Sequence, residues 1–258
     1  MITHLQIEMF PCLDDNYGFL LHDPVSGSTA AIDTPDAEVI ASQLEARGWT
    51  LTHILNTHHH GDHAGGNLAL KARYGCTVVG PASDPDRIPG MDQGVSESDR
   101  VQFGDFAIEV IETPGHTRSH IIYYVPAAEA AFVGDTLFAM GCGRLFEGSP
   151  AQMMTSLSKL AALPDDTAVY CAHEYTESNG RFALSLEPRN EALVRRMAAV
   201  RRCRAQGEPT VPTTLALEKA TNPFLRTHSA ELRSAAGVDG PAVDVFARTR
   251  QLKDGFRG

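Results

Sequence analysis

The segment Thr57–Gly66 gathers side chains that can bind metal ions. Four histidines and one aspartate fall between His58 and His63. Imidazole and carboxylate groups suit zinc, iron and manganese, and two such ions about 3.5–4 Å apart can share a hydroxide. A polar loop or an expression tag would also be rich in histidine. However, this segment lies between a strand-like apolar run, Leu51–Leu55, and a helical pattern, Asn67–Tyr74, where a tag is not expected.

The spacing within the segment directs its side chains toward two points. Residues two apart in an extended chain point the same way, so His58 and His60 can face one point while His59 faces away. Asp62 and His63 come where the chain turns into the helix, so they can face a second point nearby. The spacing therefore predicts ligands for two neighbouring metal ions.

Three further candidates, His116, Asp135 and His173, each come just after an apolar strand pattern. Strand ends converge on one edge of a sheet, where binding sites are commonly built. Any one of these residues alone would more often be a surface or packed residue. As a group, together with the histidine-rich segment, they favour a site.

The seven candidates can be allocated to two ions that share one carboxylate. The predicted ligands of the first ion are His58, His60 and His116. Those of the second are Asp62, His63 and His173. Asp135 has two oxygens and can bridge both ions. His59 and His120 are left over, and we expect them to support the ligands or to pack.

The composition fits a cytosolic globular protein of one or two domains. The chain has 258 residues, 43% of them hydrophobic, which is enough for a sizeable core. No apolar run approaches the roughly 18 residues of a membrane span, and the N-terminus shows no signal-peptide pattern. The five cysteines form no CxxC pair, so reduced thiols are expected rather than a disulfide framework.

The charge is unevenly distributed along the chain. Residues 1–177 contain 24 Asp and Glu against 8 Lys and Arg, a net charge of −16. Residues 178–258 contain 8 against 14, a net charge of +6. The overall charge of −10 argues against a general nucleic-acid binder. The basic segment could attract an anionic ligand, although arginine pairs such as Arg195–Arg196 also suit solvated helix faces.

Short apolar or alternating runs separated by turn residues predict strands up to about residue 175. They cover residues 5–10, 17–21, 29–32, 51–55, 77–79, 100–103, 106–111, 120–125, 130–133 and 167–171. Helical patterns interrupt them at 36–47, 67–74 and 153–163, and residues 81–98 are expected to form a surface loop. Beyond residue 175 only helices are expected, at 191–204, 214–220, 230–236 and 241–252. This order predicts an α+β or α/β sandwich with an appended helical domain.

At this point the motifs resemble a known family over nearly the whole chain. The metal-binding motifs, Thr57–His63, Thr113–His116, Gly134–Asp135 and Ala172–Tyr175, resemble those of the metallo-β-lactamase superfamily. Three further motifs, Gly141–Arg144, Thr221–Phe224 and Arg250–Asp254, are similar to those of the hydroxyacylglutathione hydrolases (glyoxalase II) within it. The resemblance implies an αββα metallo-β-lactamase-like catalytic domain over residues 1–175 and a helical glutathione-binding domain over 176–258.

The resemblance also implies which residues meet the substrate. Arg144, Tyr175, Arg250 and Lys253 would contact the glutathione moiety. Arg144 stands where the family often has lysine, which keeps the charge but alters the geometry. Phe146 stands where some members have a ligand-contacting tyrosine, so one hydroxyl contact is not expected here.

The implied reaction is hydrolysis of S-D-lactoylglutathione to glutathione and D-lactate. It would use hydroxide on two divalent ions, with zinc expected and iron or manganese as alternatives, and Asp62 and Asp135 would be catalytic through those ions. A thiol leaving group with a pKa near ~8.5 departs without strong acid help, which disfavours amidase chemistry. A cytoplasmic monomer with a small-molecule substrate, and with neither nucleic-acid nor membrane partners, is expected.

The sequence also allows other functions. Within the same fold they are a β-lactamase, a lactonase, a ribonuclease and a mononuclear-iron glutathione persulfide dioxygenase. The helical segment disfavours the first two, and the acidic charge disfavours the ribonuclease. The dioxygenase would differ in holding one iron and consuming oxygen. A metal-binding module without activity is the alternative of another class, and thioesterase turnover that is lost with a chelator would exclude it.

Overall fold

The computed structural model describes residues 5–258. Residues 1–4, the start of the N-terminal stretch in which no signal peptide was expected, lie outside the described residues. The chain divides into two compact units. The first comprises residues 5–112 and 119–134, and the second comprises residues 113–118 and 135–258.

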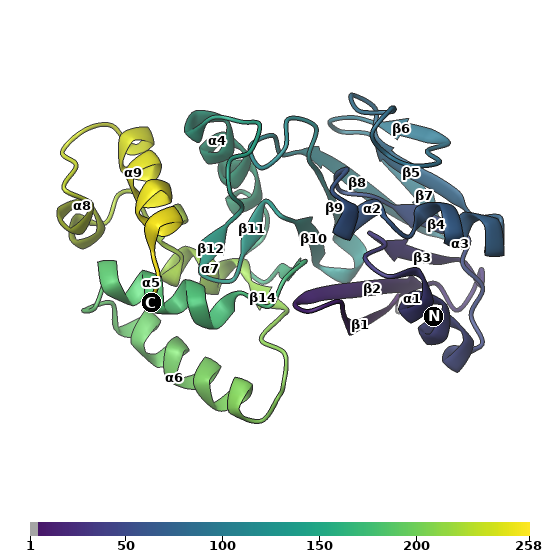
Figure 1. The fold of residues 1–258 in the computed structure, drawn as a ribbon, viewed down its shortest axis with the longest axis horizontal. Helices are drawn as coiled ribbons and strands as arrows, with labels where there is room; N and C mark the ends of the chain where they lie inside the picture. The colour runs from purple at the N-terminus through teal and green to yellow at the C-terminus, as the bar shows by residue number, and fades with distance from the viewer. Residues whose placement is uncertain (1–4) are drawn as a thin grey trace. The chain divides into compact units, whose positions relative to one another are not determined.

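The first unit contains a six-stranded sheet whose strand order follows the sequence (Figure 1). Its strands are β1 (Gln6–Cys12), β2 (Asn16–His22), β3 (Thr29–Ile32), β4 (His53–Leu55), β5 (Thr77–Pro81) and β6 (Gln93–Val95). The first three pair antiparallel, and β3 to β6 pair parallel. Ile32 is in register with Leu55, so the residues that follow β3 and β4 emerge at the same edge.

Four antiparallel strands of the same unit face this sheet. They are β7 (Arg100–Phe103), β8 (Phe106–Glu112), β9 (Ile121–Val125) and β10 (Ala130–Gly134), and the 3₁₀ turn η1 (Pro126–Ala128) joins the last two. Phe132 on β10 packs edge-on against Phe19 on β2, with ring centroids 5.6 Å apart. The Tyr123 hydroxyl donates to the carbonyl of Asn56 just beyond β4. These contacts join the inner faces of the two sheets, and β2, β3, β9 and β10 are buried along nearly their whole length.

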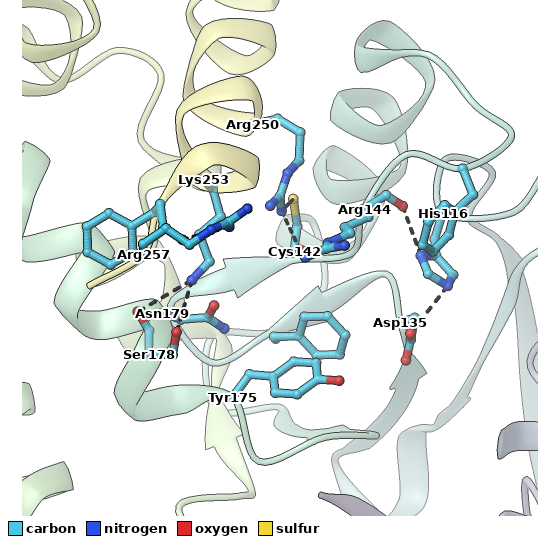
Figure 2. A pocket seen from close by; sticks show the side chains of 13 residues that line it. His116, Asp135, Cys142, Arg144, Tyr175, Ser178, Asn179, Arg250, Lys253 and Arg257 are labelled. Carbon is cyan, nitrogen blue, oxygen red and sulfur yellow. Dashed lines mark hydrogen bonds and ion pairs between the residues drawn. The ribbon is translucent and has the colours of Figure 1, made fainter.

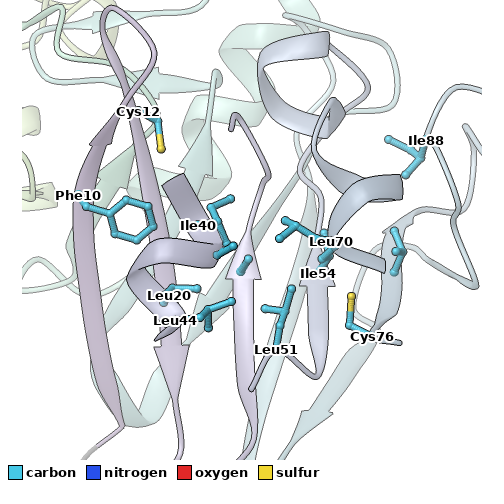
Figure 3. Packing of buried hydrophobic residues seen from close by; sticks show 13 residues of the cluster. Phe10, Cys12, Leu20, Ile40, Leu44, Leu51, Ile54, Leu70, Cys76 and Ile88 are labelled. Atoms are coloured by element: carbon cyan, nitrogen blue, oxygen red, sulfur yellow. The ribbon is translucent and has the colours of Figure 1, made fainter. Parts of the chain in front are cut away.

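Helices α1 (Ala37–Arg47) and α3 (Asn67–Tyr74) belong to the first unit, as does the single turn α2 (Gly61–Ala64). Asp36 caps α1 by accepting from the backbone N–H groups of Glu38 and Val39, and Gly48 ends it in the left-handed conformation. Ile40 and Leu44 of α1 and Leu70 of α3 pack into the apolar cluster above the sheet (Figure 3). This packing fixes the strand edge from which α2 emerges.

The second unit is mainly helical. Its helices are α4 (Pro150–Ala161), α5 (Thr176–Leu186), α6 (Glu191–Ala205), α7 (Leu215–Thr221), α8 (Ala230–Ala236) and α9 (Ala242–Gly255), with the 3₁₀ turn η2 (Pro223–Leu225). Two short strand pairs accompany them: β11 (Leu137–Phe138) with β12 (Gly141–Cys142), and β13 (Ala168–Cys171) with β14 (Thr213–Thr214). Met140, Ala183, Leu193, Met197 and Val200 form an apolar cluster of this unit.

The structure corrects the sequence prediction at five elements. The expected loop at residues 81–98 contains β6, which pairs through its backbone and has no apolar alternation to reveal it. The region after residue 175, expected to be helical only, contains β14. The β11–β12 hairpin and α5 were not predicted. Gly180 lies in the middle of α5 because a Cβ there would meet the Met197 sulfur at 1.9 Å, and this glycine obscures the helical pattern.

Among the helices of residues 5–258, none combines the length and the apolarity needed to cross a bilayer. The expected domain boundary at residue 175 differs from the division into compact units, which describes packing, and it stays a prediction.

Candidate metal centre and anion-binding pocket

In the first unit the histidine-rich segment leaves β4 and folds back on itself. His58 and His63 are buried, with exposed fractions of 0% and 1%. His58 Nε2 lies 3.0 Å from His60 Nδ1, and His63 Nε2 lies 3.4 Å from Asp62 Oδ2. Nitrogen ligands about 2.0–2.1 Å from a tetrahedral zinc ion would be about 3.3 Å apart, so these spacings suit shared ions.

Asp33 orients this group, and the sequence analysis missed it. Its Oδ2 accepts from His63 Nδ1 at 2.8 Å and from the Thr57 hydroxyl at 2.8 Å, and its Oδ1 accepts from the Thr57 N–H at 2.7 Å. The bond at Nδ1 leaves His63 Nε2 as the ligand atom, the usual arrangement of a carboxylate behind a metal-binding histidine. Asp33 has a left-handed φ of 57°, strain that the surrounding contacts must hold. Its place directly after β3 was the available signal.

Further polar residues contact the histidine-rich segment or lie within it. Asn16 Nδ2 donates to Asp62 Oδ2 at 3.1 Å. His59 faces Asp84 and Arg87, with its Nε2 3.0 Å from Arg87 Nη1. His120 is buried, and its ring stacks on His58 with centroids 4.7 Å apart. These positions agree with the expectation that His59 and His120 support or pack.

In the second unit one carboxylate lies between two imidazoles. His116 Nε2 is 3.3 Å from Asp135 Oδ2, and His173 Nε2 is 3.3 Å from Asp135 Oδ1. All three side chains are buried, the most exposed at 8%. His116 Nδ1 donates to the Arg144 carbonyl at 2.9 Å, which directs its Nε2 toward Asp135. An aspartate with one imidazole at each oxygen is the arrangement that a bridging carboxylate requires.

Gly143 lets the backbone approach this trio. A Cβ at that position would lie 2.0 Å from the Asp135 carbonyl and 3.0 Å from His116 Nδ1. Only glycine fits there, which gives the Gly141–Arg144 motif a physical reason.

A pocket of about 490 Å³ opens beside Asp135 within the second unit (Figure 2). His116 and Asp135 lie at one end, and the other end carries basic side chains from the end of α9. Its thirteen lining residues are His116, Asp135, Phe138, Cys142, Arg144, Phe146, Tyr175, Ser178, Asn179, Arg250, Lys253, Phe256 and Arg257. All four residues expected at a substrate site line it. Arg257, which follows the end of α9, was not predicted from the sequence.

The basic residues of the pocket differ in what they can offer a ligand. Arg250 is only 5% exposed; its Nη1 donates to the Cys142 carbonyl at 2.8 Å and its Nη2 to Asp254 at 2.7 Å. Lys253 Nζ lies 3.4 Å from the Ser178 hydroxyl and 5.5 Å from the centre of the Phe182 ring. Arg144 and Arg257 are exposed. Arg250 is thus held in a fixed position in the pocket wall, whereas Arg144, Arg257 and Lys253 can turn toward an anion.

Burial lowers the pKa of Lys253 from its usual 10.5 to about 8. The positive charges of Arg250, Arg181 and Arg144 contribute to this lower pKa, and Asp254 opposes them. Gathering like charges at a partly buried site costs free energy that an anionic ligand would offset.

The apolar part of the pocket consists of aromatic rings. Tyr175 stacks on His173 with centroids 4.8 Å apart and an interplanar angle of 1°. Phe138 packs edge-on to Tyr175 at 5.3 Å, and Phe146, 61% exposed, packs edge-on to His116 at 5.2 Å. Aromatic walls with a few polar and charged groups are typical of small-molecule sites.

Models of two known families together match residues 18–256 of this chain. The model of the metallo-β-lactamase superfamily matches residues 18–173, and that of the hydroxyacylglutathione hydrolase C-terminus matches residues 174–256. The hydroxyacylglutathione hydrolase of Brucella anthropi is 56% identical over 253 residues, covering 98% of this chain and 97% of that protein.

The chain belongs to the hydroxyacylglutathione hydrolase family of the metallo-β-lactamase superfamily. The family's hydrolase from Maricaulis maris is likewise 56% identical, over 99% of this chain and 100% of that protein. Among solved structures, ETHE1 from Myxococcus xanthus is similar with a TM-score of 0.66 and 25% identity, covering 98% of this chain and 100% of that one. The predicted fold class, a metallo-β-lactamase fold with a helical C-terminal region, is confirmed.

The chemistry of the donor set fits divalent metal ions. The ligand-type residues in each unit are imidazoles and carboxylates, which zinc, iron and manganese all accept. In His63 and His116 the Nδ1 atom is bonded to an oxygen of the protein, so the Nε2 atom is directed outward as a ligand.

Proposed function

We propose that this chain hydrolyses 2-hydroxyacyl glutathione thioesters, with S-D-lactoylglutathione as the principal substrate and glutathione and D-lactate as products. The observation that carries the proposal is the pocket that joins His116 and Asp135 to a basic wall in a chain of this family. Relatives 56% identical over nearly their full length bear the name of this activity.

We propose the two-ion allocation for the seven ligand-type residues. His58, His60 and His116 would hold one divalent ion, Asp62, His63 and His173 a second, and Asp135 would bridge them. The spacings within each unit support this, above all the Asp135 carboxylate with one imidazole at each oxygen. Zinc is the proposed metal, with iron and manganese as alternatives. When bound, such ions supply hydroxide at neutral pH by lowering the pKa of water.

The chain's own residues would bind and orient the thioester. Glutathione carries two carboxylates, which suit the guanidinium of Arg144 and the ammonium of Lys253. Tyr175 offers a hydroxyl, and Arg250 adds its charge while it holds the Cys142 carbonyl. The departing thiol has a pKa near ~8.5, so the site needs no acid to protonate it. Phe146 replaces a hydroxyl contact with an apolar one next to His116.

We further propose that the protein acts as a monomer in the cytoplasm. The free state of all five cysteines in the structure suits a reducing compartment.

A hydrolysis assay with S-D-lactoylglutathione, combined with elemental analysis of the same sample, tests the proposal. We expect turnover that chelation abolishes and that added metal restores, with two ions per active chain. Full activity with at most one ion per chain would reject the dinuclear allocation. Oxygen uptake with glutathione persulfide and no thioester hydrolysis would instead indicate a dioxygenase.

A further inference from the structure

The β11–β12 hairpin forms one wall of the pocket and depends on support from the C-terminal helices. Phe138 on β11 and Cys142 on β12 both line the pocket. Cys142 is labelled in Figure 2. Met140, in the turn between them, has a left-handed φ of 56°. A non-glycine residue in that conformation costs on the order of 1 kcal/mol or more, so neighbouring contacts must hold it.

Glu218 on α7 holds the turn of the hairpin. Its carboxylate is fully buried, and its Oε2 accepts from the Met140 N–H at 2.8 Å. Its Oε1 accepts from the Thr213 hydroxyl at 2.7 Å and from the guanidinium of Arg196. The charge of Glu218 is therefore paired, and its second oxygen is directed at the hairpin.

Asn222 holds the two strands on either side of that turn. Its side-chain amide donates to the Phe138 carbonyl at 3.1 Å and to the Gly141 carbonyl at 2.9 Å. The same amide donates to Glu218 Oε2 at 2.9 Å, which joins the two supports. Asn222 is fully buried and cannot contact a ligand itself.

Residues of the hairpin contact other residues that line or adjoin the pocket. The Phe138 ring packs against Tyr175 and against His173, at 5.3 and 5.8 Å. The Cys142 carbonyl receives Arg250 Nη1 at 2.8 Å. A shift of the hairpin would move the aromatic wall and release the Arg250 guanidinium.

We propose that Glu218 and Asn222 are positioning residues of the substrate pocket, which fix the β11–β12 hairpin so that Phe138 and Arg250 keep the geometry that binds glutathione. The inference rests on the proposed function, because the ligand of the pocket is taken from it. Both residues act through the hairpin.

The chain offers a matched control for a purely structural role. Glu187, at the end of α5, is also a fully buried carboxylate paired with an arginine. It accepts from Arg226 and from the Ser229 hydroxyl, far along the chain from β11 and β12. Loss of charge at Glu187 should destabilise the fold much as loss at Glu218 does, because both carboxylates are fully buried and each is paired with an arginine.

The experiment compares Glu218→Gln, Asn222→Ala and Glu187→Gln in the metal-loaded full chain. Calorimetry with glutathione gives Kd, steady-state kinetics with S-D-lactoylglutathione give KM and kcat, and thermal melting gives stability. We expect all three variants to melt earlier than the wild type. Only Glu218→Gln and Asn222→Ala should raise Kd and KM, by about five- to tenfold, with kcat changed less. Hydrogen exchange at the Met140 amide should accelerate in Glu218→Gln and Asn222→Ala, and not in Glu187→Gln.

Two other results would overturn the proposal. Kd and KM in both hairpin variants equal to those of Glu187→Gln would make the network a structural one only. A loss confined to kcat would place its effect outside binding. If Glu218→Gln does not fold, Asn222→Ala alone decides by the same comparison. A wild type that hydrolyses no glutathione thioester would instead reject the proposed function, which separates the two failures.

Discussion

Residue types and spacing were enough to find the candidate ligands, but not the residues that orient them. The histidine-rich segment and the strand-end residues His116, Asp135 and His173 stand out because imidazoles and carboxylates recur where chains turn. Residue type and spacing alone did not identify Asp33. Its role depends on the parallel register of β3 and β4, which brings it beside Thr57 and His63 from more than twenty residues away. The local signal of Asp33 is its place directly after β3, and that place does not identify its partners.

Replacing Asp33 with asparagine should weaken metal binding without unfolding the chain. The amide keeps one acceptor for Thr57 but loses the carboxylate that fixes His63 through Nδ1. Changes behind a metal-binding histidine cost about 10–100-fold in metal affinity or activity. Metal content after dialysis against a graded chelator measures this. Asp23→Asn is the control, since Asp23 is also buried but accepts hydrogen bonds from Ser26 and Val25 instead. Equal metal retention in both variants would contradict the assignment.

Lys253 should make ligand binding depend on pH near neutrality. Burial, reinforced by Arg250, lowers its pKa to about 8, so the free site loses this charge as pH rises through about 8. A bound carboxylate would raise that pKa again, so binding takes up a proton and is stronger on the acid side of this window.

Calorimetry with S-methylglutathione, whose thiol is blocked, checks the direction of this pH dependence of binding. We expect Kd to increase between pH 7 and pH 9 in the wild type, and this dependence to be much smaller in Lys253→Met. Ser178→Ala, which removes one weak contact of the ammonium, should keep it. A rise of equal steepness in Lys253→Met would assign the titration to another group.

At the scale of elements, helices and strands with strong periodicity were predicted well, and those held by tertiary contacts were not. Asp36 as the cap of α1 and Gly48 as its end follow from local chemistry. By contrast, β6, β14 and the β11–β12 hairpin have at most three residues in a strand, so their sequences carry almost no alternation. The hairpin carries part of the pocket wall, so the least predictable element is also one that the site needs.

Gly143, just beyond this hairpin, should not tolerate a methyl group. A Cβ would lie 2.0 Å from the Asp135 carbonyl, so Gly143→Ala must displace Asp135 or His116. Overpacking of this kind costs about 1–3 kcal/mol, and here the displacement falls on candidate ligands. We expect lower melting temperature, lower metal content and a large loss of kcat. Gly255→Ala at the end of α9, where a Cβ meets nothing within 4 Å, is the control. Wild-type kcat and metal content in Gly143→Ala would refute this account.

At the scale of the whole molecule, the uneven distribution of charge along the chain predicted the basic nature of the pocket better than it predicted which residues line the pocket. The net charge of +6 after residue 177 suggested that the segment could attract an anion, and basic side chains of α9 do line a pocket. Most of the other arginines of that segment serve different ends: Arg196 pairs with buried Glu218, Arg226 with buried Glu187, and Arg195 with Glu191 on an exposed face. Net charge identifies a basic segment of the chain. Only the contacts of each side chain distinguish the cations that can bind a ligand from those that stabilise the fold.

Substrate binding should therefore weaken with salt through only a few of these cations. Charges at a pocket mouth are screened over a Debye length of about 8 Å at physiological ionic strength, and each exposed pair contributes about 1 kcal/mol or less. Arg144 and Arg257 are both exposed and line the pocket, so neutralising either one should raise KM several-fold at low salt. The increase of KM with salt should also become smaller. We expect kcat to change little, because these groups bind ground and transition states alike. Arg202→Met, on an exposed stretch of α6 outside the pocket, should leave both KM and its salt slope as in the wild type. Steady-state kinetics at low and high salt on the three variants decide the matter. If Arg202→Met flattens the slope as much as Arg144→Met, the salt effect belongs to the net charge of the segment and not to the pocket.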